Sequence, residues 1–123
     1  MEKTACRIAD TVFNTVKNSF GQTVERILKN KECQFETKES LIKFILELYN
    51  LQDGRCAITA IPMELDDSFT NKEFKVSLDR IDSNGHYEQH NLQLLCAFVN
   101  RWKSNDDNDN FKKLIDRLQK RGD

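Results

Sequence analysis

Three consecutive stretches of the sequence decide its fold: CAITAIPM at residues 56–63, SLDRIDSNGHY at residues 77–87 and HNLQLLCAFVNRWKS at residues 90–104. Apolar and polar residues alternate over residues 74–78, which predicts a half-buried strand that ends at Asp79-Arg80. A Ser-Asn-Gly turn then leads to the apolar run LQLLC, which predicts a second strand over residues 92–96. Residues 97–104 predict a helix in which Trp102 is partly buried.

Helical spacing of apolar residues dominates the first half of the chain. It predicts one helix over residues 8–20 and a second, short helical stripe over residues 24–28. Thr37 is a suitable N-cap for a third helix, which we expect to end near Asn50. Because amphipathic helices usually bury their apolar side, we expect these faces to form part of the core.

Two further elements flank the central region. Residues 55–61 predict a short strand whose length is limited by Pro62. Residues 111–120 predict a last helix with an apolar packing face of Phe111, Leu114, Ile115 and Leu118. The chain of 123 residues is thus predicted to be a single α+β domain. Its parts are a helical segment over 1–54, a central unit over 55–105 and a C-terminal helix over 106–123.

Composition narrows the class of protein. The formal net charge is −1, so a global basic field for coating nucleic acid is absent, although a local basic groove is still compatible with nuclease activity. No apolar run is long enough to span a membrane, and we expect no membrane partner. Four scattered cysteines, Cys6, Cys33, Cys56 and Cys96, form no CxxC pair. Reduced thiols in a cytoplasmic protein are the simplest interpretation.

Four polar residues follow one another at characteristic spacing: Asp79, Asn91, Asn100 and Lys103. This pattern resembles the HNH endonucleases, whose fold is a ββα-metal hairpin and helix, over less than half of the chain. The resemblance implies N-terminal helices followed by this motif and a C-terminal helix. It also implies DNA as the partner and a hydrolase that nicks or cleaves DNA with one divalent cation, Mg²⁺ or Mn²⁺.

The resemblance assigns a role to each matching residue. Asp79 and Asn100 would be the metal ligands, and a hard cation that keeps several waters needs no more than two protein oxygens. Asn91 would tie the loop between the strands to the backbone. Lys103 and Arg101, on the exposed side of the helix, would contact DNA phosphates.

One departure from the family concerns structural zinc. Many HNH domains hold Zn²⁺ with two CxxC pairs. Here the pairs run from Cys56 to Thr59 and from Cys96 to Val99, so each has lost its second cysteine. Because two thiolates cannot complete a tetrahedral site, we expect no structural zinc.

A second departure concerns the general base. Arg80 occupies the place of the family's histidine, and arginine stays protonated at any working pH. It could instead contact phosphate and stabilise the transition state. The candidates for the base are then His86, His90 and Tyr87 in the loop between the strands. Two alternatives are open: a catalytically inactive DNA-binding module on an HNH scaffold, and a protein-interaction domain.

Overall fold

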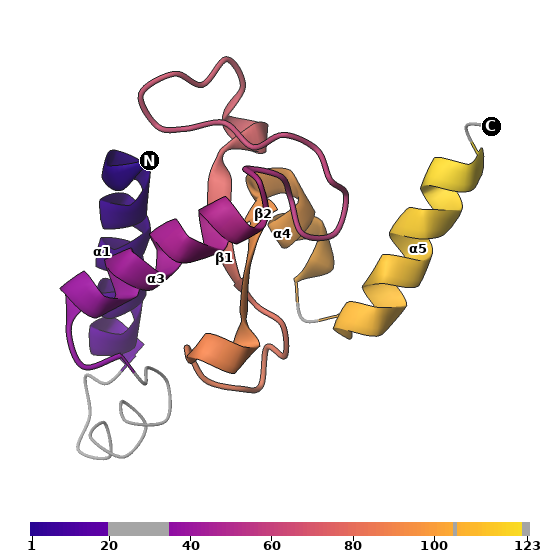
Figure 1. The fold of residues 1–123 in the computed structure, drawn as a ribbon. Coiled ribbons are helices and arrows are strands. Elements are labelled where there is room, and N and C mark those ends of the chain that lie inside the picture. Colours follow the sequence, from indigo (N-terminus) through magenta and orange to yellow (C-terminus); the bar gives the residue numbers. More distant parts are fainter. Residues whose placement is uncertain (20–34, 105, 122–123) are drawn as a thin grey trace.

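The computed structural model describes residues 1–19, 35–104 and 106–121 (Figure 1). Within these residues the chain forms a small α+β fold. Its elements are α1 (Glu2–Ser19), α3 (Lys38–Leu51), the 3-10 helix η1 (Lys72–Phe74), β1 (Val76–Arg80), the 3-10 helix η2 (Gln89–Asn91), β2 (Leu92–Cys96), α4 (Ala97–Lys103) and α5 (Asn108–Arg121). The short helical stripe predicted over residues 24–28 lies outside the described residues.

α1 and α3 pack against each other on one side of the molecule (Figure 1). The prediction of Thr37 as an N-cap is confirmed: its hydroxyl accepts from the backbone N–H of Ser40 at 3.0 Å. Ser40 Oγ in turn accepts from the Thr37 N–H at 3.3 Å. Such a capping box satisfies amide groups that the first helical turn leaves unpaired. It fixes the start of α3, which places Leu41 and Ile45 in the core.

The two predicted central strands are also present. β1 and β2 pair in antiparallel register, with Asp79 opposite Gln93 and Arg80 opposite Leu92. All five residues of β2 are buried, whereas β1 is buried at Val76 and Asp79. β2 is covered because α3 and α4 both contact it, and α4 follows it directly in the chain. Strand, loop, strand and helix therefore form one continuous unit.

Residues 55–61 do not form the predicted strand. The Cys56 N–H donates to Ile61 O and the Ala60 N–H donates to Cys56 O, both at 2.9 Å, so the chain closes into a turn. Ala60 has a φ of 63°, which is incompatible with an extended strand. Only an isolated bridge joins Arg55 to Pro62.

The exposure of several apolar residues also differs from the prediction. Trp102 is 58% exposed and contacts Phe98 edge-on, because α4 ends just beyond it and leaves its outer side uncovered. On α5, Phe111 and Ile115 are buried, but Leu114 and Leu118 are 50% and 58% exposed. The packing face of α5 is thus narrower than the apolar spacing predicts.

The two central cysteines lie together in the core. Cys56 and Cys96 are both buried free thiols whose side chains are hydrogen-bonded. Hydrogen bonds from Cys96 and Thr59 lower the pKa of Cys56 to about 5, and the bond to Cys56 raises the pKa of Cys96. Val99 is fully buried. The remaining cysteines of the incomplete CxxC pairs thus contact each other, and Val99 packs in the core where the second pair has lost its cysteine. No helix in the described residues has the length and apolar character needed to cross a bilayer.

This packing predicts that the fold does not depend on zinc. Purified protein should contain far less than one zinc per chain by elemental analysis, and a chelator should leave the thermal unfolding midpoint unchanged. A stoichiometric zinc content, together with unfolding on chelation, would mean that Cys56 and Cys96 recruit further ligands.

Candidate functional site

The loop between the two strands is held by Asn91. Its Oδ1 accepts from the Asp82 N–H at 2.8 Å, and its Nδ2 donates to the carbonyl oxygens of Asp82 and His86, each at 3.0 Å. A Cβ atom at Gly85 would lie 2.6 Å from Asn91 Nδ2, so these hydrogen bonds of Asn91 need a glycine at position 85. The amide of Asn91 thus joins both arms of the loop to the start of β2, the role that the HNH resemblance implies for this position.

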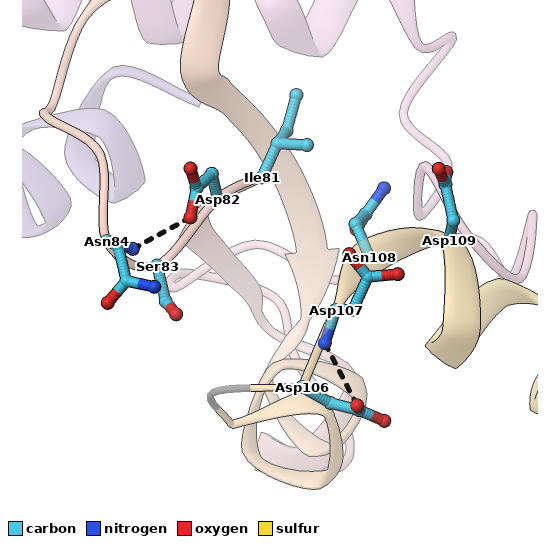
Figure 2. Close-up of a pocket in the computed structure, with 8 residues that line it drawn as sticks. All are labelled: Ile81, Asp82, Ser83, Asn84, Asp106, Asp107, Asn108 and Asp109. Carbon is cyan, nitrogen blue, oxygen red and sulfur yellow. Dashed lines mark hydrogen bonds between the residues drawn. The ribbon is translucent and has the colours of Figure 1, made fainter.

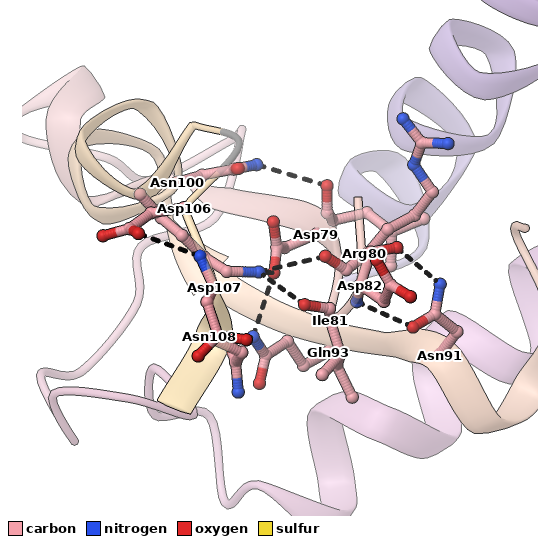
Figure 3. A network of polar contacts seen from close by, with 12 residues as sticks. Asp79, Arg80, Ile81, Asp82, Asn91, Gln93, Asn100, Asp106, Asp107 and Asn108 are labelled. Atoms are coloured by element: carbon pink, nitrogen blue, oxygen red, sulfur yellow. Dashed lines mark hydrogen bonds and ion pairs between the residues drawn. The ribbon is translucent and has the colours of Figure 1, made fainter. Parts of the chain in front are cut away.

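Asp79 and Lys103 form a buried ion pair that joins β1 to α4. Lys103 Nζ lies 2.6 Å from Asp79 Oδ2, and the side-chain exposures are 0% and 7% respectively. The ammonium also donates to the carbonyl oxygens of Arg80 and Ile81 at 3.0 and 3.1 Å. Figure 3 labels the three acceptor residues, Asp79, Arg80 and Ile81. All three ammonium protons therefore have acceptors, which offsets the cost of burying the charge.

The expectation that Lys103 lies on the exposed side of its helix is wrong. α4 packs on the sheet with its last turn over the end of β1, and this turn carries the lysine inward. The Asp79 carboxylate and the strand-end carbonyls supply the only kind of environment in which a buried ammonium is stable. Lys103 is thus a positioning residue in this structure.

Asn100 lies one helical turn before Lys103 and faces the same strand. Its Nδ2 donates to Ser77 Oγ at 2.7 Å and to the Leu78 carbonyl at 3.2 Å. Because a carbonyl only accepts, the nitrogen must be the atom that faces β1, and Oδ1 is turned away from it. No hydrogen bond to Asn100 Oδ1 or to Asp79 Oδ1 comes from the described part of the chain.

These two oxygens fit a divalent cation in type and number. Mg²⁺ binds through one or two protein oxygens and keeps waters for the rest of its octahedron. Among residues 1–19, 35–104 and 106–121, no cluster of three or more His, Cys, Asp or Glu residues is arranged to hold a metal, so water would have to supply the remaining ligands. The ammonium of Lys103 on Asp79 Oδ2 opposes a second cation, and this competition is the main electrostatic feature of the site.

Sequence reasoning missed Gln93. Its Nε2 donates to Asp79 Oδ2 at 2.9 Å and to Asn108 Oδ1 at 3.0 Å, so it links the carboxylate to the start of α5. A glutamine within the otherwise apolar run LQLLC was the available signal, because a buried polar side chain needs a partner. The antiparallel register supplies that partner by placing Asp79 directly opposite.

The candidates for the general base lie in the loop around Arg80. Arg80 Nη1 donates to the Gly85 carbonyl at 3.0 Å, and its guanidinium lies 4.9 Å from the centre of the Tyr87 ring. His86 is half-buried and His90 is exposed. Within the described residues, no hydrogen bond joins either imidazole to Asp79 or Asn100. The structure therefore brings Arg80 and Tyr87 together, and no hydrogen bond within the described residues joins either histidine to the oxygen pair.

Arg101 is exposed and is held by an acidic partner. Its two terminal nitrogens each lie 2.9 Å from an oxygen of Glu73. Hydrogen bonding and charge from Arg101 lower the pKa of Glu73. A phosphate would therefore have to compete with Glu73 for this guanidinium.

An acidic cavity of about 390 Å³ lies beside the ion pair, between residues 81–84 and residues 106–109 (Figure 2). Its carboxylates have local backbone partners. Asp82 accepts from the Asn84 N–H at 3.0 Å, and Asp106 accepts from the Asp107 N–H at 2.9 Å. Asp107 accepts from the Asn110 N–H at 2.9 Å, in the first turn of α5. These are turn and helix-start roles, and the negative charge here repels phosphate.

The buried pair makes a prediction about stability. Lys103→Met should lower the free energy of unfolding by about 3 kcal/mol, because it leaves the Asp79 carboxylate buried without its counter-charge. Urea denaturation measures the loss. The double variant Asp79→Leu, Lys103→Met should lose less than the two single variants combined. Additive losses would show that the two side chains do not stabilise each other.

The comparisons with known proteins leave the family undetermined. Neither models of protein families, nor curated proteins, nor solved structures gave a match to this chain. The likeness to HNH endonucleases therefore rests on Asp79, Asn91, Asn100 and Lys103 alone. Any function has to be inferred from how these side chains lie within the β1–β2–α4 unit.

Proposed function

We propose that the chain is a metal-dependent DNA endonuclease of the HNH type, which nicks or cleaves phosphodiester bonds. One observation carries the proposal: Asp79 on β1 and Asn100 on α4 lie where the helix packs on the strand, and each has one side-chain oxygen to which no described residue donates. The loop beside them is fixed by Asn91. A rigid pair of hard oxygen donors next to a tied loop suits phosphodiester hydrolysis.

Asp79 and Asn100 would hold one Mg²⁺ or Mn²⁺, which supplies Lewis-acid stabilisation of charge on the phosphate and the leaving oxygen. The chain's contribution is to fix the two donors. Asn100 is oriented by Ser77 and the Leu78 carbonyl, and Asp79 by Gln93. This orientation is built in before any cation binds, so the ion pair of Asp79 with Lys103 is the interaction that would have to adjust.

Lys103 has a role that follows from its position. A cation at Asp79 competes with its ammonium for the same carboxylate, so cation binding weakens the ion pair. Lys103 would keep its bonds to the carbonyl oxygens of Arg80 and Ile81, so it positions the end of β1 rather than contacting DNA. A cation therefore has to weaken the ion pair between Lys103 and Asp79 in order to bind.

Water activation is assigned to the loop. A neutral imidazole can accept the proton, and His86 and His90 are both candidates, with Tyr87 as the alternative. Arg80 would contact phosphate. Its present bond to the Gly85 carbonyl and its position over Tyr87 keep the guanidinium at the base of the loop.

A second candidate function is a DNA-binding module that has lost catalysis. Two observations favour it: the Asp79 carboxylate is already paired with Lys103, and an arginine stands where the family has its base. Both functions involve DNA, so metal-dependent nicking is the property that separates them.

A nicking assay on supercoiled plasmid tests the metal assignment. The protein should convert supercoiled to open-circular DNA with Mg²⁺ or Mn²⁺, and excess chelator should stop it. Asn100→Ala should abolish nicking because it removes one of two oxygen donors, while circular dichroism stays near that of the parent protein. Lys43→Gln, an exposed change on α3, is the matched control and should nick normally.

Asn100→Asp is a more specific variant for the same assay, because it keeps an oxygen donor at position 100. It should retain part of the activity that Asn100→Ala loses. Full activity in a folded Asn100→Ala protein would remove Asn100 from the cation site. DNA binding without any metal-dependent nicking in the parent protein would favour the inactive module.

The histidine assignment has its own test. The double variant His86→Ala, His90→Ala should lose nicking while its affinity for DNA in a mobility-shift assay stays unchanged, because only proton transfer is removed. Tyr87→Phe serves as the comparison. If the double variant nicks at the parent rate and Tyr87→Phe does not, the tyrosine is the base instead.

A further inference from the structure

Positive charge is concentrated on the last helix. α5 carries five basic residues, Lys112, Lys113, Arg117, Lys120 and Arg121, and two acidic ones, Asp109 and Asp116, a net charge of +3. The whole chain carries −1, so all other residues together carry −4. The excess positive charge of this protein therefore lies on one α-helix, and the rest of the chain is acidic.

The basic residues lie on the outer side of this helix. Lys113, Arg117 and Lys120 are spaced four and three residues apart, which places them on one face, and all three are exposed. Phe111 and Ile115 are buried and attach the helix to the rest of the molecule. At about 100° per residue, the basic face lies roughly opposite this buried face. The three cations thus point to solvent and span about 10 Å along the axis.

The helix is fixed relative to the candidate site. At its start, Asn108 Oδ1 accepts from Gln93 Nε2, which also donates to Asp79. Near its end, Gln119 Nε2 lies 3.4 Å from the Thr59 carbonyl. Figure 1 shows α5 beside α4, on the side of the molecule away from α1 and α3. A ligand on the basic face therefore has a set position relative to Asp79.

Two of the three basic residues that the sequence assigns to DNA contact, Lys103 and Arg101, are already engaged, and the third, Arg80, donates to the Gly85 carbonyl. Lys103 is buried against Asp79, and Arg101 is paired with Glu73. On the basic face of α5, Lys120 pairs with Asp116 of the same helix, and no ion pair to Lys113 or Arg117 is found among the described residues. On α5, Lys113 and Arg117 therefore offer exposed cations to a polyanion.

We propose that α5 is the surface that binds the DNA backbone, through Lys113, Arg117 and Lys120. This inference rests on the proposed function, since it names the element that holds the substrate of the same site. Charge complementarity identifies the partner, because a helix of net charge +3 on a chain of net charge −1 fits a dense polyanion. Phosphates spaced 3.4 Å along the axis of each strand allow three contacts within the length of this face.

The exposed leucines of α5 allow a protein partner to be distinguished from DNA. Leu114 and Leu118 lie on the side of α5 between the buried and the basic faces, and they would contribute to an interface with a protein rather than with phosphates. Variants of the two sets of residues therefore separate electrostatic from apolar docking.

The test is a mobility-shift titration of a short duplex of arbitrary sequence, in chelator and over a series of salt concentrations. The triple variant Lys113→Gln, Arg117→Gln, Lys120→Gln should bind more weakly. Its plot of log affinity against log salt should be less steep by about 2 to 3, since each lost phosphate contact removes about 0.9. The matched control is Lys3→Gln, Lys38→Gln, Lys43→Gln, which removes the same charge from exposed positions on α1 and α3. It should keep the parent slope, as should Leu114→Ala, Leu118→Ala.

Four outcomes would overturn the inference. Equal losses in the two triple variants would mean that total charge, not α5, governs binding. Loss of affinity in the leucine variant alone would identify an apolar docking surface. Undiminished binding by the α5 variant would remove the helix from the DNA interface and leave the proposed function standing, whereas absence of binding by the parent protein at low salt would overturn both.

Discussion

The buried ion pair between Asp79 and Lys103 is the constraint on which the rest of the site depends. It joins the end of β1 to the last turn of α4, and Gln93 extends it to the start of α5. Charges this deeply buried are tolerated only with a full set of partners. The Asp79 carboxylate therefore connects β1, α4 and the start of α5.

The same ion pair sets two roles of Asp79 against each other. Under the proposed function, the carboxylate that stabilises the fold through Lys103 would also be a ligand of the divalent cation. The two roles compete for one group, so a metal that binds here has to displace part of a stabilising interaction. Asn100 does not share this conflict, because its nitrogen makes the structural bonds to β1 and its oxygen remains available.

Local patterns in the sequence predicted the elements that depend on local physics. The alternation before Asp79, the apolar run 92–96 and the N-cap Thr37 each indicated the element that is found. The role of Asn91 followed from the resemblance to HNH endonucleases, and an amide that both donates and accepts suits a bond across this loop. These features are decided within a few residues of one another along the chain or across one hairpin.

Features set by long-range packing could not be predicted in the same way. Lys103 is buried because α4 packs over a strand end more than twenty residues earlier in the chain, and helical spacing alone does not reveal this. Gln93 acquires its role from the register with β1, and residues 55–61 close into a turn against β2 instead of extending. The exposed leucines of α5 have the same origin, because only part of the apolar stripe finds a surface to cover.

Paramagnetic relaxation by Mn²⁺ is the measurement that tests the central claim most directly. In an NMR titration, the side-chain amide of Asn100 and the backbone signal of Asp79 should broaden first and together, and the ammonium environment of Lys103 should change as its ion pair weakens. Broadening confined to Asp106, Asp107 and Asp109, with Asn100 and Asp79 unaffected, would place the cation in the acidic cavity and contradict a metal site at the Asp79–Asn100 pair.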